Sequence, residues 1–262
     1  MEDKYKYVID HYKNDYSEDE RFTQDRAHSV EYLTTKKYIE KFLKPGDRIL
    51  EVGAATGAYS LYYAALGYQV DALDLVDSNI DILKSKVTKD MNISPVVGTA
   101  LDLSRYDDNT FDMTLVLGPL YHLYTDEDRR LAIREAVRVT KPNGYLYFAY
   151  LPNDAVFANY VIKKRHLLET DHLCEDNYRL KNVPEEVFST FYVSEFEKMM
   201  EDYPVEFLHD VATDGICYML KEYVNELSDE EFNVLLDYHY STCERKDLNG
   251  YSSHMLYIGR KK

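Results

Sequence analysis

Two carboxylates and two glycines, Glu51, Asp74, Gly53 and Gly57, have residue types and a spacing suited to ligand binding. Glu51 lies in the apolar segment 48–52, and the two glycines follow it, where glycine takes backbone angles closed to other residues. Asp74 ends the next apolar segment, roughly twenty residues beyond the turn. Because carboxylates accept hydrogen bonds, this pattern favours a ligand that carries an amine or hydroxyl groups.

A strand, a turn and a helix are needed to position these residues. Residues 48–52 have the composition of a buried strand, and residues 60–66 have helical spacing before Gly67 ends the helix. Residues 68–74 form the next expected strand. In such a βαβ unit the backbone N–H groups of the turn approach the ligand, and the second acid lies against ribose hydroxyls.

Two protein classes use this device. Dinucleotide enzymes have G-x-G-x-x-G, but Ala55 and Ala58 stand here in place of the second and third glycines. The run Glu51-x-Gly53-x-Ala55-x-Gly57 resembles more closely the E/D-x-G-x-G-x-G motif of class I S-adenosylmethionine-dependent methyltransferases. Ala55 is the one departure from that motif, and its methyl group narrows the space in which a ligand can approach the backbone of the turn.

Later segments support the same resemblance. The apolar strand expected at 114–117 is followed by Gly118 and Pro119, where the family's fourth strand ends beside the methyl donor. The run 138–146, Arg-Val-Thr-Lys-Pro-Asn-Gly-Tyr-Leu, is similar to the segment that precedes the family's fifth strand. Strands are also expected at 205–211 and 254–259. The family's last strand is antiparallel and pairs beside the sixth, which dinucleotide folds lack.

The resemblance implies an α/β fold with a Rossmann-like, seven-stranded mixed sheet, helices on both faces and an antiparallel last strand. We expect a single methyltransferase domain over residues 1–262, with an N-terminal lid segment over 1–35. A helix is expected over 26–43 inside that segment. Residues 152–203 leave the alternation of strands and helices, and they are expected to form a helical cap over the substrate.

The resemblance also implies which residues bind the cofactor, S-adenosylmethionine. Glu51 receives the methionine ammonium, and the turn at Gly53, Ala55 and Gly57 permits close approach. Asp74 accepts from the ribose hydroxyls. The other implied cofactor contacts are Leu75, Asp102 and Leu103 near the ribose and adenine, and Leu117 and Gly118 at the methionine moiety. Two alternatives stay open. Glu51 and Asp74 could be strand-end acids at a solvated rim, and Thr99 could stand in place of Asp102 at the position that is usually acidic in the family.

Methyl transfer needs little more from a protein than positioning of the acceptor and exclusion of water. A base matters only for an acceptor that is protonated near neutral pH. His122, with Tyr121 as its neighbour, is the candidate base, since a histidine pKa starts near neutral; the alternative is that His122 caps or packs at the start of the next helix. Arg26, His28 and Glu31 are candidate pocket residues or members of a solvated helix face. No spacing of acids and histidines indicates a metal site.

The composition limits the classes of binding partner that the chain can have. The formal net charge of −16 and the absence of a basic stripe argue against nucleic acid. The three cysteines are widely spaced, the N-terminus lacks an apolar signal region, and no apolar run is long enough to span a membrane. We therefore expect a cytoplasmic monomer or homodimer that methylates a small molecule. The alternatives are a nicotinamide-dependent Rossmann oxidoreductase and a non-catalytic, S-adenosylmethionine-binding regulatory protein.

Overall fold

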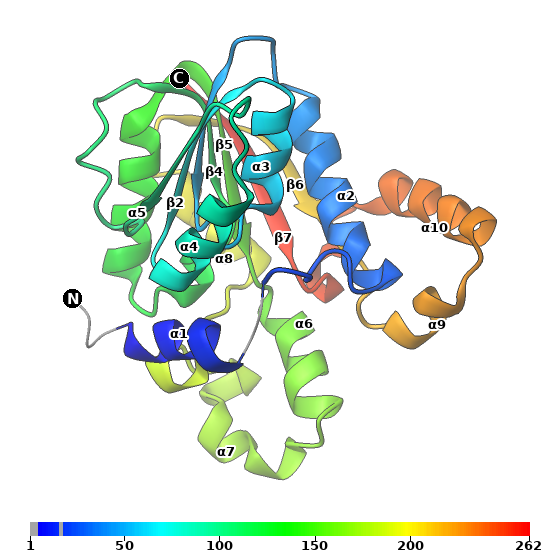
Figure 1. Cartoon of the computed structure of the whole chain (residues 1–262). Coiled ribbons are helices and arrows are strands. Elements are labelled where there is room, and N and C mark those ends of the chain that lie inside the picture. Colours follow the sequence, from blue (N-terminus) through cyan, green and yellow to red (C-terminus); the bar gives the residue numbers. More distant parts are fainter. Residues whose placement is uncertain (1–4, 16–17) are drawn as a thin grey trace.

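A computed structural model of the chain describes residues 5–15 and 18–262. A seven-stranded sheet forms its centre, with the strand order β3-β2-β1-β4-β5-β7-β6 (Figure 1). The strands are β1 (Arg48–Val52), β2 (Gln69–Asp74), β3 (Ile93–Val97), β4 (Phe111–Val116), β5 (Thr140–Tyr150), β6 (Val205–Ala212) and β7 (Met255–Lys261). The helices are α1 (Lys6–Asp10), α2 (Arg26–Glu40), α3 (Ala58–Ala65), α4 (Asp77–Lys86), α5 (Asp126–Val139), α6 (Asn153–Val156), α7 (Thr170–Leu173), α8 (Val193–Met200), α9 (Lys221–Glu226) and α10 (Asp229–Thr242).

The strand directions confirm the fold class expected from the sequence. Strands β1 to β5 pair in parallel, whereas β7 lies between β5 and β6 and is antiparallel to both. Strand order reverses between β1 and β4, and this reversal opens a crevice at the carboxyl ends of the parallel strands. The chain's binding site is therefore expected there.

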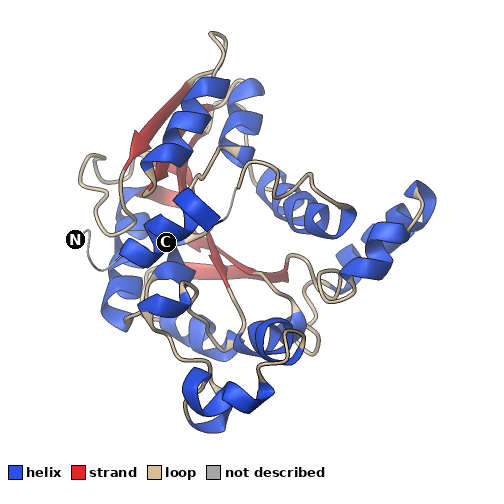
Figure 2. Cartoon of the chain, turned by 60° about the horizontal axis from the view of Figure 1, so that its bottom comes forward, coloured by secondary structure: helices blue, strands red, loops and turns tan. Residues whose placement is uncertain are grey.

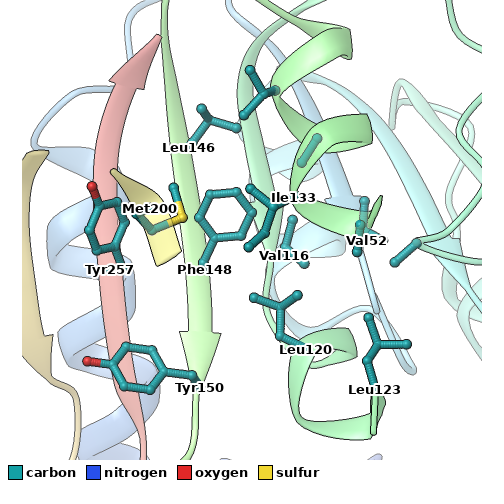
Figure 3. Packing of buried hydrophobic residues seen from close by; sticks show 14 of the residues in the cluster. Val52, Val116, Leu120, Leu123, Ile133, Leu146, Phe148, Tyr150, Met200 and Tyr257 are labelled. Carbon is teal, nitrogen blue, oxygen red and sulfur yellow. The ribbon is translucent and has the colours of Figure 1, made fainter. Parts of the chain in front are cut away.

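Helices cover both faces of the sheet (Figure 2). One apolar cluster joins α5 and α8 to one face, and a second joins α2 and α3 to the other. In the first cluster Phe148 of β5 lies close to Ile133 of α5 and Met200 of α8 (Figure 3). Burial of a side chain of this size stabilises the fold by about 1.5–3 kcal/mol, so the two clusters fix the strands that carry the site.

The starts of two helices follow from local chemistry. A threonine followed three residues later by an acid predicts a helix N-cap at Thr125, and its side chain accepts from the backbone N–H of Asp128 at the start of α5. The same kind of pattern predicts a capping box at Ser228 and Glu231, and these residues form one at the start of α10. The helix expected over 26–43 ends earlier, with α2 at Glu40.

The start of β5 differs from what the local sequence predicts. The Lys-Pro-Asn-Gly run at 141–144 has the composition of a helix end and a turn, so a strand is expected from Tyr145 on. The strand begins at Thr140, because Thr140 pairs with Phe111 before the register shifts and Tyr145 pairs with Met113. Asn143 in the intervening bulge has φ 63°, a left-handed conformation that asparagine tolerates well. The Lys-Pro-Asn-Gly run, residues 141–144, therefore forms a bulge inside β5 and not a loop before it.

The N-terminal segment lies beside the crevice rather than on the outer faces of the sheet. Tyr5 and Val8 line the same pocket as Val52 of β1 and Asp74 of β2. The rings of His11 and Phe188 meet edge to face at 5.7 Å, which brings this segment against the region after β5 (Figure 1). Residues 1–4 and 16–17 of the expected lid lie outside the described residues.

Candidate active site

The turn after β1 forms the floor of the site. Gly53 has φ 82°, and a Cβ added to it would lie 2.6 Å from Cδ of Pro119, so only glycine fits between the two loops. Ala55 also has a positive φ, of 45°, and Gly57 caps the start of α3 at φ 92°. The turn thus has the left-handed conformations that its glycines indicate, and Ala55 adopts one of them without being glycine.

Asp74 joins this turn to the end of β2. Its Oδ2 accepts from the backbone N–H of Ala55 at 2.8 Å, and its Oδ1 accepts from that of Val76 at 2.8 Å. Burial raises the pKa of Asp74, and the two N–H groups partly offset that effect. The side-chain amide of Asn79 lies 3.4 Å from the same Oδ1. Because a carboxylate has about four acceptor sites, acceptor capacity remains for a hydroxyl of a ligand.

A pocket with about 720 Å³ of empty space, counted out to its mouth, opens above Asp74. Its walls come from the ends of β1, β2 and β4 and from the N-terminal segment. Leu75, Val76 and Ala100 give it an apolar side. Such a combination of apolar walls and a few polar groups, with Asp74 among them, is typical of a small-molecule or cofactor site.

The segment after β4 closes the pocket. Pro119–His122 forms a single 3-10 turn, and Tyr121 and His122 line the pocket. His122 Nδ1 lies 2.9 Å from the carbonyl oxygen of Val187, and its Nε2 lies 2.9 Å from the hydroxyl of Tyr12. A carbonyl only accepts, so Nδ1 carries the proton and Nε2 accepts from Tyr12. Burial lowers the pKa of His122 to about 4.

Comparison with known proteins points to one family. The family profile described as "Methyltransferase domain" matches residues 50–148, which run from the middle of β1 into β5 and include the turn after β1. The chain is 25% identical over 226 residues to a glycine/sarcosine N-methyltransferase of Aphanothece halophytica, over 79% of this chain and 83% of that protein. It is 32% identical over 125 residues to a demethylmenaquinone methyltransferase of Renibacterium salmoninarum, over 45% of this chain and 50% of that protein. It thus spans about half the length of that second relative.

Solved structures agree. A protein of Thermotoga maritima, described as a S-adenosylmethionine-dependent methyltransferase and possible histamine N-methyltransferase, is similar with a TM-score of 0.58 and 18% identity. The similarity covers 98% of this chain and 99% of that one, including the antiparallel end of the sheet. Residues 50–148 match a methyltransferase domain, and the chain has the fold of class I S-adenosylmethionine-dependent methyltransferases.

The residues of this methyltransferase fit the cofactor of its family. The apolar side of the pocket suits a purine, and Asp74 at the strand end suits vicinal hydroxyls. At Gly53 a Cβ is excluded by Pro119, so the turn after β1 packs directly against the segment after β4, and both border the pocket. The residues expected from the sequence that line the pocket are Gly53, Ala55, Asp74, Leu75, Leu117, Gly118, Tyr121 and His122.

Four expected cofactor residues lie outside the lining of the methyltransferase pocket. Glu51 is buried and accepts from the hydroxyl of Ser60, and burial raises its pKa to about 8. Gly57 packs toward Leu83. Leu103 is buried in the core, whereas Asp102 is exposed and accepts from the backbone N–H of Ser104. Thr99, the alternative to Asp102, does line the pocket.

A second, smaller cavity, with about 300 Å³ of empty space counted out to its mouth, adjoins this pocket. Leu117 and Arg21 line both, so the two spaces meet at the end of β4. Glu31 and His254 contribute polar groups to the second cavity. Of the three helix residues proposed from the sequence, Glu31 lies at this site. Arg26 pairs instead with Asp229, and the His28 ring with Asp25.

Sequence reasoning missed several of the polar residues around the two cavities. Tyr12, Glu18 and Arg21 come from a segment whose helical signal is weak, and His254 directly precedes the last strand. The one sequence signal for these residues is the position of His254 at the start of the last expected strand. The remaining contacts depend on how the N-terminal segment packs, which no local pattern specifies.

Among residues 5–15 and 18–262, no helix is long and apolar enough to cross a membrane.

Proposed function

We propose that this methyltransferase transfers the methyl group of S-adenosylmethionine to a small-molecule acceptor. The observation that carries this proposal is the junction of the two cavities at Leu117 and Arg21. The pocket above Asp74 would hold the cofactor, and the smaller space beside it carries the polar groups of Glu31 and His254. A recessed space of this kind suits a small acceptor and not a folded macromolecule.

The chain's own residues would bind the cofactor and exclude water from it. Asp74 would accept from ribose hydroxyls, Leu75 and Thr99 would contact the nucleoside, and the backbone at Leu117 and Gly118 would meet the methionine moiety. S-adenosylmethionine supplies an electrophilic methyl group on a sulfonium, so the protein has mainly to position the acceptor. Tyr5, Val8 and Tyr12 of the expected lid segment cover the pocket, which supports the exclusion of water.

His122 is better suited to positioning than to proton transfer. Both ring nitrogens have partners, Val187 and Tyr12, and a pKa of about 4 makes a weak base at neutral pH. We propose that His122 holds the Tyr12 hydroxyl over the pocket, and that Tyr121 forms part of the adjoining wall. This role replaces the general base that the sequence suggested for His122.

Other features support the small-molecule proposal. Two similar proteins are named for small-molecule acceptors, glycine or sarcosine and demethylmenaquinone. The net charge of −16 disfavours a nucleic-acid substrate. We further propose that the chain acts in the cytoplasm as a monomer or homodimer, with residues 152–203 as the cap over the acceptor.

Isothermal titration of the full chain with S-adenosylhomocysteine, with NADH in parallel, tests the cofactor assignment. Asp74→Asn should weaken binding of S-adenosylhomocysteine by about 10- to 100-fold, because a hydrogen bond to a charged group contributes about 1.5–3 kcal/mol. Asp71→Asn is the matched control: Asp71 lies on the same strand but pairs with Arg48. Binding of NADH in place of S-adenosylhomocysteine would favour the oxidoreductase alternative.

A further inference from the structure

A buried carboxylate orients a histidine toward the second cavity. Asp214 Oδ2 lies 2.9 Å from His254 Nδ1, and Asp214 Oδ1 accepts from the Ser252 hydroxyl at 2.6 Å and from the Ser253 N–H at 2.7 Å. Asp214 is 2% exposed. Burial acts to raise the pKa of Asp214, but the hydrogen bonds from His254 and Ser252 outweigh it and hold the pKa below its usual value. An ionised Asp214 fixes the proton of neutral His254 on Nδ1.

The other nitrogen of His254 is therefore an acceptor that faces a cation. Arg21 Nη2 lies 3.1 Å from His254 Nε2, and 2.9 and 2.8 Å from the two carboxylate oxygens of Glu31. A positively charged N–H donor is thus held between a carboxylate and an imidazole lone pair. A protonated amine offers the same donors in a smaller group.

The charge around this point favours a cation over an anion. Glu18 lies 3.7 Å from Arg21 Nη1, so three carboxylates, Glu18, Glu31 and Asp214, surround one guanidinium and one imidazole. If Arg21 withdraws, the carboxylates are left in a partly buried space without their counter-ion. An anionic acceptor would be repelled there, and a neutral one would leave the carboxylates unpaired.

We propose that Glu31 and His254 form the acceptor site for a small primary or secondary amine, with His254 as the general base and Asp214 as its positioning residue. Arg21, in the turn before α2, occupies the place of the amine until the acceptor displaces it. This inference rests on the proposed methyltransferase function and specifies its substrate class.

The proton balance is simple. The ammonium of the acceptor gives one proton to His254 Nε2: one N–H bond of the acceptor breaks, one forms on the imidazole, and the amine keeps the electron pair as its nucleophilic lone pair. His254 then releases the proton to water. The carboxylates of Glu31 and Asp214 raise the pKa of His254 against the effect of burial and of Arg21, which suits a base that works near neutral pH.

The first test is binding to the full chain saturated with S-adenosylhomocysteine, measured by calorimetry. The probes are n-butylamine, benzylamine and histamine, with n-butanol and benzyl alcohol as neutral matches and butyrate as the anionic match. We expect only amines to bind. Binding of the alcohols or of butyrate in preference to the amines overturns the proposal, and so does the failure of every amine. If S-adenosylhomocysteine itself does not bind, the proposed function fails instead.

Variants then separate the roles. Glu31→Gln should weaken amine binding by about tenfold or more, whereas Arg21→Met should strengthen it by a similar factor, because the competing guanidinium is gone. A merely structural ion-pair network would not give the second result, and weaker amine binding to Arg21→Met would overturn the proposal. The same geometry of Glu31, Asp214 and His254 could attract a divalent cation, so Zn²⁺ binding that excludes amines would also overturn it.

For an amine that turns over, His254→Gln should lower kcat by about 10²- to 10⁴-fold with little change in amine binding. His209→Gln is the matched control. His209 lies 2.8 Å from Glu244 and 2.9 Å from Lys41, an equivalent set of partners away from both cavities. Equal losses in the two variants, or loss of S-adenosylhomocysteine binding in His254→Gln, would contradict a catalytic role. Thermal unfolding checks that each variant is folded.

Discussion

The backbone nitrogen of Ala55 lies 2.8 Å from Asp74 Oδ2. This one hydrogen bond ties the turn after β1 to the end of β2, so the carboxylate that faces the pocket also holds the pocket's floor. The same carboxylate accepts from Val76 at the start of α4. Binding and local stability are therefore expected to depend on the same side chain.

Asp74→Ala should lower the free energy of unfolding by about 1–3 kcal/mol in the absence of ligand, because the N–H groups of Ala55 and Val76 lose their acceptor in a buried site. Urea unfolding at neutral pH measures this. Asp71→Ala removes the partner of Arg48 and should cost less than Asp74→Ala, because the guanidinium of Arg48 is partly exposed and can bind water instead. Equal effects of the two substitutions would contradict the structural role given to Asp74.

Gly53→Ala should destabilise the protein by about 1–3 kcal/mol more than Gly46→Ala. Both glycines have a positive φ, 82° and 88°, so the conformational cost of alanine is shared. They differ in space: a Cβ at Gly53 meets Pro119 at 2.6 Å, whereas nothing lies within 4 Å of one at Gly46. Thermal or urea unfolding of the two variants isolates the contact with Pro119. S-adenosylhomocysteine binding should fall only in Gly53→Ala.

Glu51 should be protonated in the folded protein at neutral pH, since burial raises its pKa to about 8. A carboxyl group whose pKa is higher in the folded than in the unfolded state contributes stability below the unfolded pKa of about 4.3. That contribution is lost as the pH rises through about 8. Glu51→Gln, which stays neutral, should therefore gain stability relative to the wild type between pH 5 and about 8.

Urea unfolding of both proteins at several pH values measures this difference. A constant difference across the range would show that Glu51 does not titrate as its burial requires. The hydroxyl of Ser60 can donate to either the carboxyl or the amide oxygen at position 51. The substitution therefore changes the charge more than the hydrogen bonding.

Tyr12→Phe should speed the release of S-adenosylhomocysteine by about fivefold, because a hydrogen bond of about 1 kcal/mol from Tyr12 to His122 helps to hold the N-terminal segment over the pocket. The edge-to-face contact of the two rings, at 5.4 Å, should remain. Stopped-flow displacement measures the rate. Tyr7→Phe, an exposed position in α1, is the control and should leave the rate unchanged. A faster release in both variants would point to general loosening of the segment.

The sequence alone determined the architecture and the floor of the candidate cofactor site. Apolar strand segments, the glycines at 53 and 57 and the acid at 74 act locally, since a strand, a left-handed turn and a helix start each depend on neighbouring residues. The antiparallel last strand was likewise predicted and is confirmed by the pairing of β7 with β5 and β6.

Only the tertiary structure decided which side chains gather around the acceptor space. Arg21 and His254 are 233 positions apart, and their contact depends on how the N-terminal segment packs against the start of β7. Glu51 was expected at the ligand, but the side-chain direction of β1 turns it toward Ser60. A sequence records residue types and spacing along the chain; long-range packing sets direction and partners, because it is fixed by the sum of many contacts and not by any local pattern.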